Sequence, residues 1–350
     1  MWEILLFISL LTGQIGRIQI SPDIAFYFHD IVIFCYLLFH IKKIRLTFIT
    51  PFITVFCAYL LLRVGTLVGL LYVLRLFMYV SAIFIVIFSK KSQLYWLKWL
   101  YYLGVGYAIL GFFQLFLYSN LRNLSYLGWD PHYLRLFSTL FDPNFVGCFL
   151  VVCFILGLYL YTNAKSKLYI IFSQILLLVA LLLTYSRSSF VAFFAGLMMY
   201  IVLTKKWIYF FWLLLFLFSL FYFPSIGGIS TEIGRLWSVT ARITNWQEGI
   251  QLFLQSPIIG NGFTIRRIDN SVLFILVTTG IIGFVAFANL GIYLIRSSSI
   301  IKKQFLKVVY FSIFAALLIH SMFVNTLFYP QILIWFWIFI GAIESKKNIT

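Results

Sequence analysis

Residues 142–189 read DPNFVGCFLVVCFILGLYLYTNAKSKLYIIFSQILLLVALLLTYSRSS and hold two apolar segments, at 142–161 and 167–184. Lys165 lies between the segments, Lys167 begins the second, and Arg187 lies in the short turn after it. A hydrocarbon core about 30 Å thick needs roughly 20 apolar residues per helix, so each segment can cross a membrane. Because lysine-bearing connections stay cytoplasmic, the stretch predicts a helical hairpin with its lysines inside and its arginine outside.

The same pattern extends over the whole chain. Hydrophobic residues make up 63% of the 350 and charged residues only 10%, which excludes an ordinary soluble domain. The sequence predicts an all-α, polytopic integral membrane protein that forms a single membrane domain over residues 1–350. About twelve transmembrane helices are expected, near 2–19, 24–41, 47–63, 67–88, 98–118, 142–161, 167–184, 189–204, 207–224, 271–295, 305–324 and 327–343.

The two kinds of basic residue are sorted differently. All fourteen lysines fall on one side of the predicted membrane, which puts both termini in the cytoplasm. Ten of the twelve arginines fall in span ends and outer loops instead: Arg17, Arg63, Arg75, Arg122, Arg135, Arg187, Arg235, Arg242, Arg266 and Arg267. A guanidinium keeps its charge when desolvated, and its planar fork matches phosphate oxygens. We therefore expect a phosphate-bearing anion at the outer half of the bilayer.

The net charge of +17 does not indicate nucleic-acid binding. Most of the basic residues fit the topology, and the anionic inner leaflet attracts such clusters. The four cysteines lie inside predicted helices, where a thiol behaves as a small apolar group, so no disulfide is expected. They are Cys35, Cys57, Cys148 and Cys153.

Two predicted outer loops, 119–141 and 225–270, are long enough to suggest function. The second contains an amphipathic stretch in which apolar side chains recur at helical spacing: Ile243, Trp246, Ile250 and Phe253. Such a helix is expected to lie on the membrane surface. Pro257 and the turn Gly260-Asn261-Gly262 should end it.

Two short segments begin helices and carry polar groups. Asp142 is expected to cap a helix that starts at Pro143. In Thr184-Tyr185-Ser186-Arg187-Ser188-Ser189, Ser188 or Ser189 can cap the next helix, and Arg187 points toward the same anion-favouring N-terminus. Each segment also has a plainer interpretation, as a capped helix beside a topological arginine.

Two further segments follow, Arg242-Ile-Thr-Asn-Trp246 leading to Ser256-Pro257-Ile-Ile-Gly260-Asn261-Gly262-Phe263, and Asp269-Asn270-Ser271 running on to Gly280 and Gly283. In this order and spacing, the segments from about Arg135 to Gly283 resemble the O-antigen ligase and Wzy-type O-antigen polymerase family. The specific parts are the Pro-Asn pair, the Tyr-Ser-Arg-Ser turn, and the Arg-x-x-x-Trp segment followed by Pro-x-x-Gly-x-Gly.

The resemblance implies a membrane glycosyltransferase of the GT-C type, on the periplasmic side of a bacterial inner membrane. It would act on glycans carried by undecaprenyl diphosphate, as both donor and acceptor, with no metal and no cofactor. A flippase and a chain-length regulator are the expected protein partners. Arginines aimed at the leaving diphosphate would stabilise its growing charge. The expected substrate-binding residues are Arg187, Arg242, Arg135, Arg75, Arg266 and Arg267.

Polar groups inside the spans point to a shared cavity. Arg75 lies deep in its predicted span, so it should face a polar cavity or pair with another group. His29, Asp30 and His320 could line the same cavity, although polar side chains also join helices in apolar bundles.

One departure from the family concerns the proton acceptor. At the position of Asp269-Asn270, ligases of the family have His-Asn or His-Ser. That histidine is the presumed base of the ligases. A carboxylate can accept the proton instead, so Asp269 and Glu232 are the expected catalytic residues, although Asp269 could be only a helix cap. The aspartate favours a polymerase. An O-antigen ligase stays open, as does a lipid-linked oligosaccharide transporter, against which the chain shows no two related halves.

Overall fold

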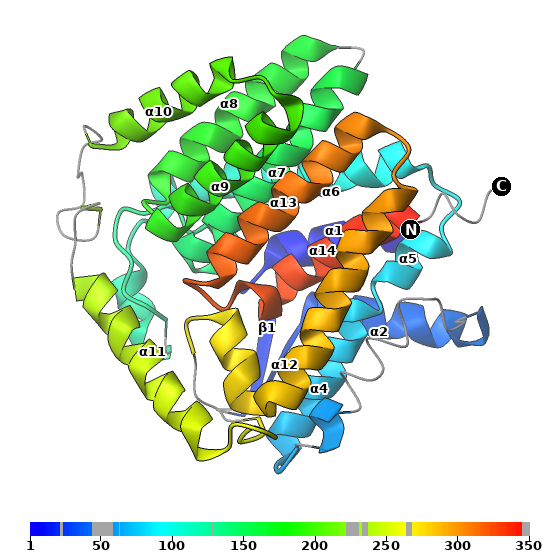
Figure 1. Ribbon diagram of the computed structural model, residues 1–350, viewed down its shortest axis with the longest axis vertical. Helices are drawn as coiled ribbons and strands as arrows, with labels where there is room; N and C mark the ends of the chain where they lie inside the picture. The colour runs from blue at the N-terminus through cyan, green and yellow to red at the C-terminus, as the bar shows by residue number, and fades with distance from the viewer. Residues whose placement is uncertain are drawn as a thin grey trace.

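The computed structural model describes residues 1–21, 24–43, 59–62, 64–127, 129–164, 166–221, 231–232, 237–263 and 268–344. Over these residues the fold is nearly all-α (Figure 1). Its helices and strands are α1 (Trp2–Thr12), β1 (Arg17–Ser21), β2 (Ile24–Tyr27), α2 (Phe28–His40), α4 (Leu67–Val80), α5 (Ile83–Ile87), α6 (Gln93–Leu117), α7 (Pro143–Asn163), α8 (Lys167–Leu183), α9 (Arg187–Thr204), α10 (Ile208–Phe221), α11 (Trp237–Gln255), α12 (Ser271–Ser297), α13 (Gln304–Ser321) and α14 (Pro330–Glu344).

Among the described residues, six helical stretches are long and apolar enough to cross a membrane. They are Leu67–Ile87, Gln93–Leu117, Pro143–Asn163, Arg187–Thr204, Ser271–Ile300 and Gln304–Ser321. The shorter helices α1, α2, α8, α10 and α14 are apolar as well. Each predicted span therefore contains helical residues, although most of 47–63 lies outside the described residues. The fold is that of a polytopic membrane protein.

The predicted spans at 2–19 and 24–41 are wrong at their facing ends, where the chain forms an antiparallel β-hairpin. The helix α1 stops at Thr12 because Gly13 adopts a left-handed conformation with φ +51°. Strands β1 and β2 then pair from Arg17 opposite Tyr27 to Ser21 opposite Ile24. Hydropathy alone predicted helix for these residues, although Gly13 and Gly16 indicate in the sequence that the helix ends.

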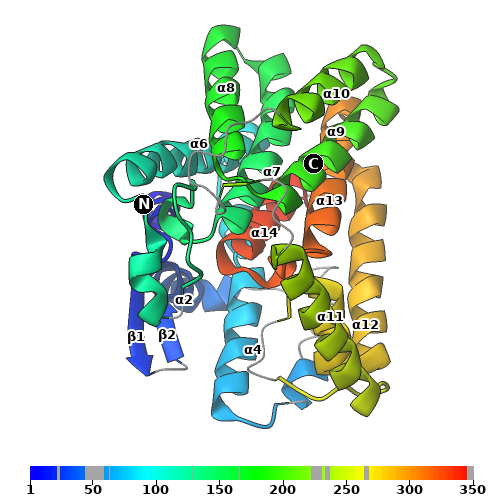
Figure 2. The same cartoon turned by 90° about the vertical axis from the view of Figure 1, so that its left-hand side faces the viewer.

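The helices form two regions. Buried helix α7 packs against α6, α8, α9 and α13, and α13 also packs along α9. Helix α14 contacts α4, α5 and α6 and so joins this bundle to the rest of the fold. Figure 2 shows the β-hairpin, α4, α11 and α12 at the end of the molecule opposite α8 and α10. This lower region and the adjoining ends of α7 and α9 surround the candidate site.

Helix α12, which the sequence predicts as continuous, is broken at Gly280, where φ is +62°. The segment after α11 fills the break: Asn261 N donates to Val277 O at 2.8 Å and Gly262 N to Thr278 O at 3.0 Å. A Cβ on Gly260 would lie 2.4 Å from Thr278 O, so the two backbones touch. The Pro-x-x-Gly-x-Gly segment is thus the piece that fits this break, and it ends α11 as predicted.

Candidate functional site

A cavity of about 850 Å³ opens between the hairpin, α4, α11 and the starts of α7 and α9. Its lining includes five of the predicted site residues, brought from distant parts of the chain: Arg75, Arg135, Arg187, Arg242 and Asp269. The size suits a substantial ligand group, and mixed polar and apolar lining is typical of binding sites.

The other predicted polar residues lie elsewhere. Glu232 is exposed and is not among the described residues that line the cavity. Arg266 and Arg267 fall outside the described residues. The buried side chains of His29, Asp30 and His320 stand behind the lining rather than in it.

Arg187 begins α9 at the cavity wall. The cap of this helix is Ser186, whose Oγ accepts from Ser189 N, so the predicted caps Ser188 and Ser189 are wrong by two and three residues. Tyr185 takes a left-handed conformation, with φ +48°, which shortens the turn and moves the cap to Ser186. An Arg187 guanidinium nitrogen donates to Ser238 Oγ on α11, and this contact joins the two helices.

A buried hydrogen-bond network supports this turn. Ser186 Oγ donates to Asn144 Oδ1 at 2.8 Å, and Ser189 Oγ lies 3.3 Å from His320 Nε2. The other ring nitrogen of His320 is 2.6 Å from Thr326 Oγ1. No local sequence pattern predicted these pairings between α7, α9 and α13. They hold the backbone that carries Arg187.

Arg242 projects from α11 into the cavity beside Arg187. Within the part of the chain that the structure describes, its guanidinium makes no hydrogen bond and no ion pair. Burial lowers the pKa of Arg242, and the carboxylates of Asp269 and Asp142 oppose that effect. Two half-buried guanidinium groups close to each other favour an anion, which offsets their repulsion.

Asp269 is fixed through its backbone rather than by capping α12. Its N–H donates to Asn245 Oδ1 at 2.8 Å, and its carbonyl accepts from Trp246 Nε1 at 3.1 Å. The cap of α12 is Asn270, whose Oδ1 accepts from Leu273 N at 3.0 Å, so the reading of Asp269 as a plain cap is wrong. The side chain of Asp269 therefore remains in the cavity lining near Arg242.

Arg135 is buried behind the α8–α9 turn. Its guanidinium donates to Thr184 O at 2.8 Å and Tyr185 O at 3.3 Å, and a third nitrogen lies 3.2 Å from His132 Nδ1. Such contacts bind the segment before α7 to the turn before α9. That segment is strained, since Leu134, Ser138 and Phe141 all have positive φ values near +50°. Arg135 also lines the cavity, and its role as a diphosphate ligand stays a prediction from the sequence.

Three possible metal ligands, Asp130, His132 and Asp142, have ligand atoms within 4.8 Å of one another. Arg135 always donates, so His132 Nδ1 must accept its hydrogen bond. In neutral imidazole the proton then resides on Nε2, and neither nitrogen offers a lone pair to a cation. In this arrangement His132 does not fit a metal. Burial, reinforced by Asp130, raises the pKa of Asp142 to about 6.

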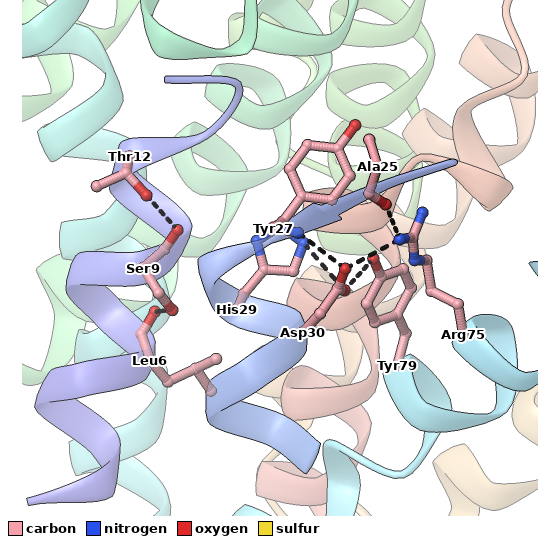
Figure 3. Close-up of polar contacts among 9 residues, drawn as sticks. All are labelled: Leu6, Ser9, Thr12, Ala25, Tyr27, His29, Asp30, Arg75 and Tyr79. Carbon is pink, nitrogen blue, oxygen red and sulfur yellow. Dashed lines mark hydrogen bonds and ion pairs between the residues drawn. The ribbon is translucent and has the colours of Figure 1, made fainter. Parts of the chain in front are cut away.

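Arg75 both faces the cavity and pairs with another group, as the sequence predicted. Its guanidinium lies 3.2 Å from the buried carboxylate of Asp30 (Figure 3). The lining also contains Arg17 and Trp129, and their side chains stack with 5.5 Å between guanidinium carbon and ring centre. The sequence suggested Asp30 as a possible cavity residue but did not pair it with Arg75, and it gave Trp129 no role.

Comparison with known proteins agrees with the motif resemblance. Residues 172–288 match the family model described as O-antigen ligase, a range that includes Arg187, Arg242 and Asp269. No curated protein matches the chain. The match supports a membrane function of the O-antigen ligase or polymerase type without separating the two. Over residues 172–288 the chain is similar to the O-antigen ligase family.

Proposed function

We propose that the protein is an O-antigen polymerase, a metal-independent membrane glycosyltransferase that joins undecaprenyl-diphosphate-linked repeat units. It acts on the periplasmic face of a bacterial inner membrane, with no cofactor and with both termini in the cytoplasm. The proposal includes about twelve spans, a GT-C-like arrangement, and a flippase and chain-length regulator as partners. The observation that carries it is the pair Arg187 and Arg242, in which Arg242 has no hydrogen-bond partner among the described residues.

In the proposed reaction, a sugar hydroxyl of one repeat attacks the anomeric carbon of another repeat. The bond from that carbon to the diphosphate oxygen breaks, and undecaprenyl diphosphate leaves with the electron pair. Arg187 and Arg242 face the oxygens that gain this charge. Preorganised donors in a water-poor site can lower such a barrier by several kcal/mol, about 3 for each important donor.

The attacking hydroxyl must lose its proton to a base. The carboxylates in the described lining are Asp130, Asp142 and Asp269, and the resemblance favours Asp269 because it replaces the ligase histidine. Asp142 is the second candidate, since its pKa is raised to about 6. Glu232 stays a proposal from the sequence and would need to approach the cavity from its exposed position.

The amphipathic helix α11 is proposed to lie at the membrane surface. Ile243 and Ile250 of its apolar stripe are exposed, whereas Arg242 and Asn245 line the cavity. A helix placed in this way would bring the cavity to the depth where the lipid diphosphate meets the bilayer.

Deletion of the gene tests the proposal. Loss of a polymerase should leave single repeats attached to the lipid A core, as shown by gel electrophoresis of the lipopolysaccharide. Loss of a ligase should instead leave long chains on undecaprenyl diphosphate. Long stranded chains would replace the polymerase assignment with the ligase alternative.

A further inference from the structure

Asp30 is a buried carboxylate that the proposed reaction does not use. Tyr79 donates its hydroxyl to Oδ1 at 2.6 Å, and Tyr27 N donates to Oδ2 at 2.9 Å. A terminal nitrogen of Arg75 lies 3.2 Å from Oδ2. Figure 3 shows the two side chains facing each other. A charge at 4% exposure is stable only when it is paired and hydrogen-bonded. The three contacts fix Asp30 between the hairpin, α2 and α4.

Arg75 is held in turn by the hairpin. One terminal nitrogen donates to Ala25 O and faces Asp30, while the rings of Phe26 and Tyr27 lie 5.5 and 5.6 Å from its guanidinium carbon. Within the described residues, Nε and the other terminal nitrogen make no hydrogen bond. The side chain is 25% exposed and lines the cavity. Asp30 therefore orients a guanidinium that still has donors for a ligand.

Arg17 adds a second cation on the same side. Its position in β1 pairs with Tyr27 in β2, and its guanidinium covers the ring of Trp129. Its Nε is buried and has no hydrogen-bond partner in the described part of the chain. Since Asp30 offsets much of the charge of Arg75, Arg17 supplies the net positive charge here.

The cavity thus has two cationic walls. We name Arg17 and Arg75, from β1 and α4, the hairpin wall, and Arg187 and Arg242, from α9 and α11, the helix wall. Each wall has its own carboxylate, Asp30 for the first and Asp269 for the second. The hairpin wall lies outside the residues that match the O-antigen ligase family.

We infer that Asp30 is a positioning residue for Arg75, and that the hairpin wall binds the diphosphate of a second lipid-linked substrate. This inference rests on the proposed polymerase function, in which donor and acceptor each carry a diphosphate. The helix wall binds the donor, because Arg242 can donate hydrogen bonds to the diphosphate oxygens that gain charge as the leaving group departs. The hairpin wall takes the acceptor, whose diphosphate stays intact. An acceptor without a lipid diphosphate would need only the helix wall.

The test counts undecaprenyl diphosphate molecules bound to the purified full-length protein by native mass spectrometry. Wild type should bind two per chain. Asp30→Asn and Arg75→Gln should each bind one, and so should the double variant Arg187→Gln, Arg242→Gln. Arg122→Gln removes an exposed arginine outside the cavity and is the matched control, with two expected.

Thermal unfolding distinguishes a variant that loses lipid binding from one that loses its fold. Arg75→Lys keeps the charge but loses the fork, so it should bind one lipid with little change in melting temperature. If Asp30→Asn fails to fold, the number of lipids bound by Arg75→Lys still tests the inference. Wild type that binds one lipid, or Arg75→Lys that binds two, would overturn the inference. The deletion phenotype would then still decide the polymerase assignment independently.

Discussion

Arg135 Nε donates a hydrogen bond to the carbonyl oxygen of Thr184 at 2.8 Å. This bond crosses from the segment before α7 to the turn before α9, and the adjacent bond to Tyr185 O strengthens the same link. The turn that carries Arg187 is therefore held in place by a second arginine, Arg135. Both arginines line the cavity, but Arg135 is also bonded to the backbone just before Arg187.

We predict that Arg135→Lys lowers stability and activity together. A lysine cannot reach both carbonyl groups with a planar fork, and each unsatisfied buried carbonyl costs about 1–3 kcal/mol. The melting temperature of the purified protein should fall by several degrees, alongside polymer yield in cells. A variant that melts like wild type but makes no polymer would instead place Arg135 at the substrate.

Arg187→Lys and Arg242→Lys should each reduce polymer synthesis by about 100-fold while leaving the protein inserted and folded. Both variants keep the positive charge but lose the bidentate geometry that matches phosphate oxygens. Gel analysis of lipopolysaccharide and immunoblots of membranes measure the two quantities. If both variants make full-length polymer, the diphosphate binds elsewhere, and Arg75 and Arg17 are the next residues to test.

The raised pKa of Asp142 predicts that the activity depends on pH. Its raised pKa, about 6, keeps the carboxyl protonated below that pH and charged above it. If Asp142 accepts the hydroxyl proton, activity of the purified enzyme should rise with pH through about 6. Asp142→Asn should then be nearly inactive at every pH. Retained activity in Asp142→Asn, with loss in Asp269→Asn, would assign the proton acceptor to Asp269.

The same carboxyl has a defined effect on stability. Because its folded pKa lies above the ordinary value of 3.8, the native state binds the proton more tightly than the unfolded chain. The contribution of Asp142 to stability is therefore present at low pH and is lost as pH rises through about 6. The melting temperature of Asp142→Asn should lack this component.

Much of the site follows from local sequence signals. Asp142 caps α7 before Pro143, and α11 ends before Pro257, as predicted. Arginines predicted within the membrane indicated a polar cavity, because burying a guanidinium costs free energy unless polar groups contact it. These signals depend on neighbours in the chain or on burial alone, so they can be read without the fold.

The remainder depends on contacts between distant segments. Asp30 meets Arg75 only because the hairpin turns where hydropathy predicted continuous spans. His320 meets Ser189 across α9 and α13, and the break at Gly280 exists because residues 257–262 fill it. No local pattern encodes these pairings, and a single sequence does not reveal them.

Reporter fusions test the topology. A periplasm-active reporter fused after Gly228 should be active, whereas fusions after Lys165 and Lys302 should be inactive, because lysine-bearing connections stay inside. Activity at Lys165 would place the arginine-rich cavity on the cytoplasmic side. That result would contradict a substrate that reaches the enzyme from the periplasmic face.

Gly280→Ala should destabilise the protein and abolish polymer synthesis. A Cβ on Gly280 would lie 2.3 Å from Ile258 O, and φ +62° is unfavourable for alanine, so the 257–262 segment must leave the break in α12. That segment follows α11, so its displacement should also shift Arg242 and Asp269. Gly291→Ala, on the same helix with no atom within 4 Å of its added Cβ, is the control. It should be neutral or gain up to about 1 kcal/mol from helix propensity. Equal melting temperatures for the two variants would show that the close contact between Gly260 and Gly280 contributes nothing to the fold.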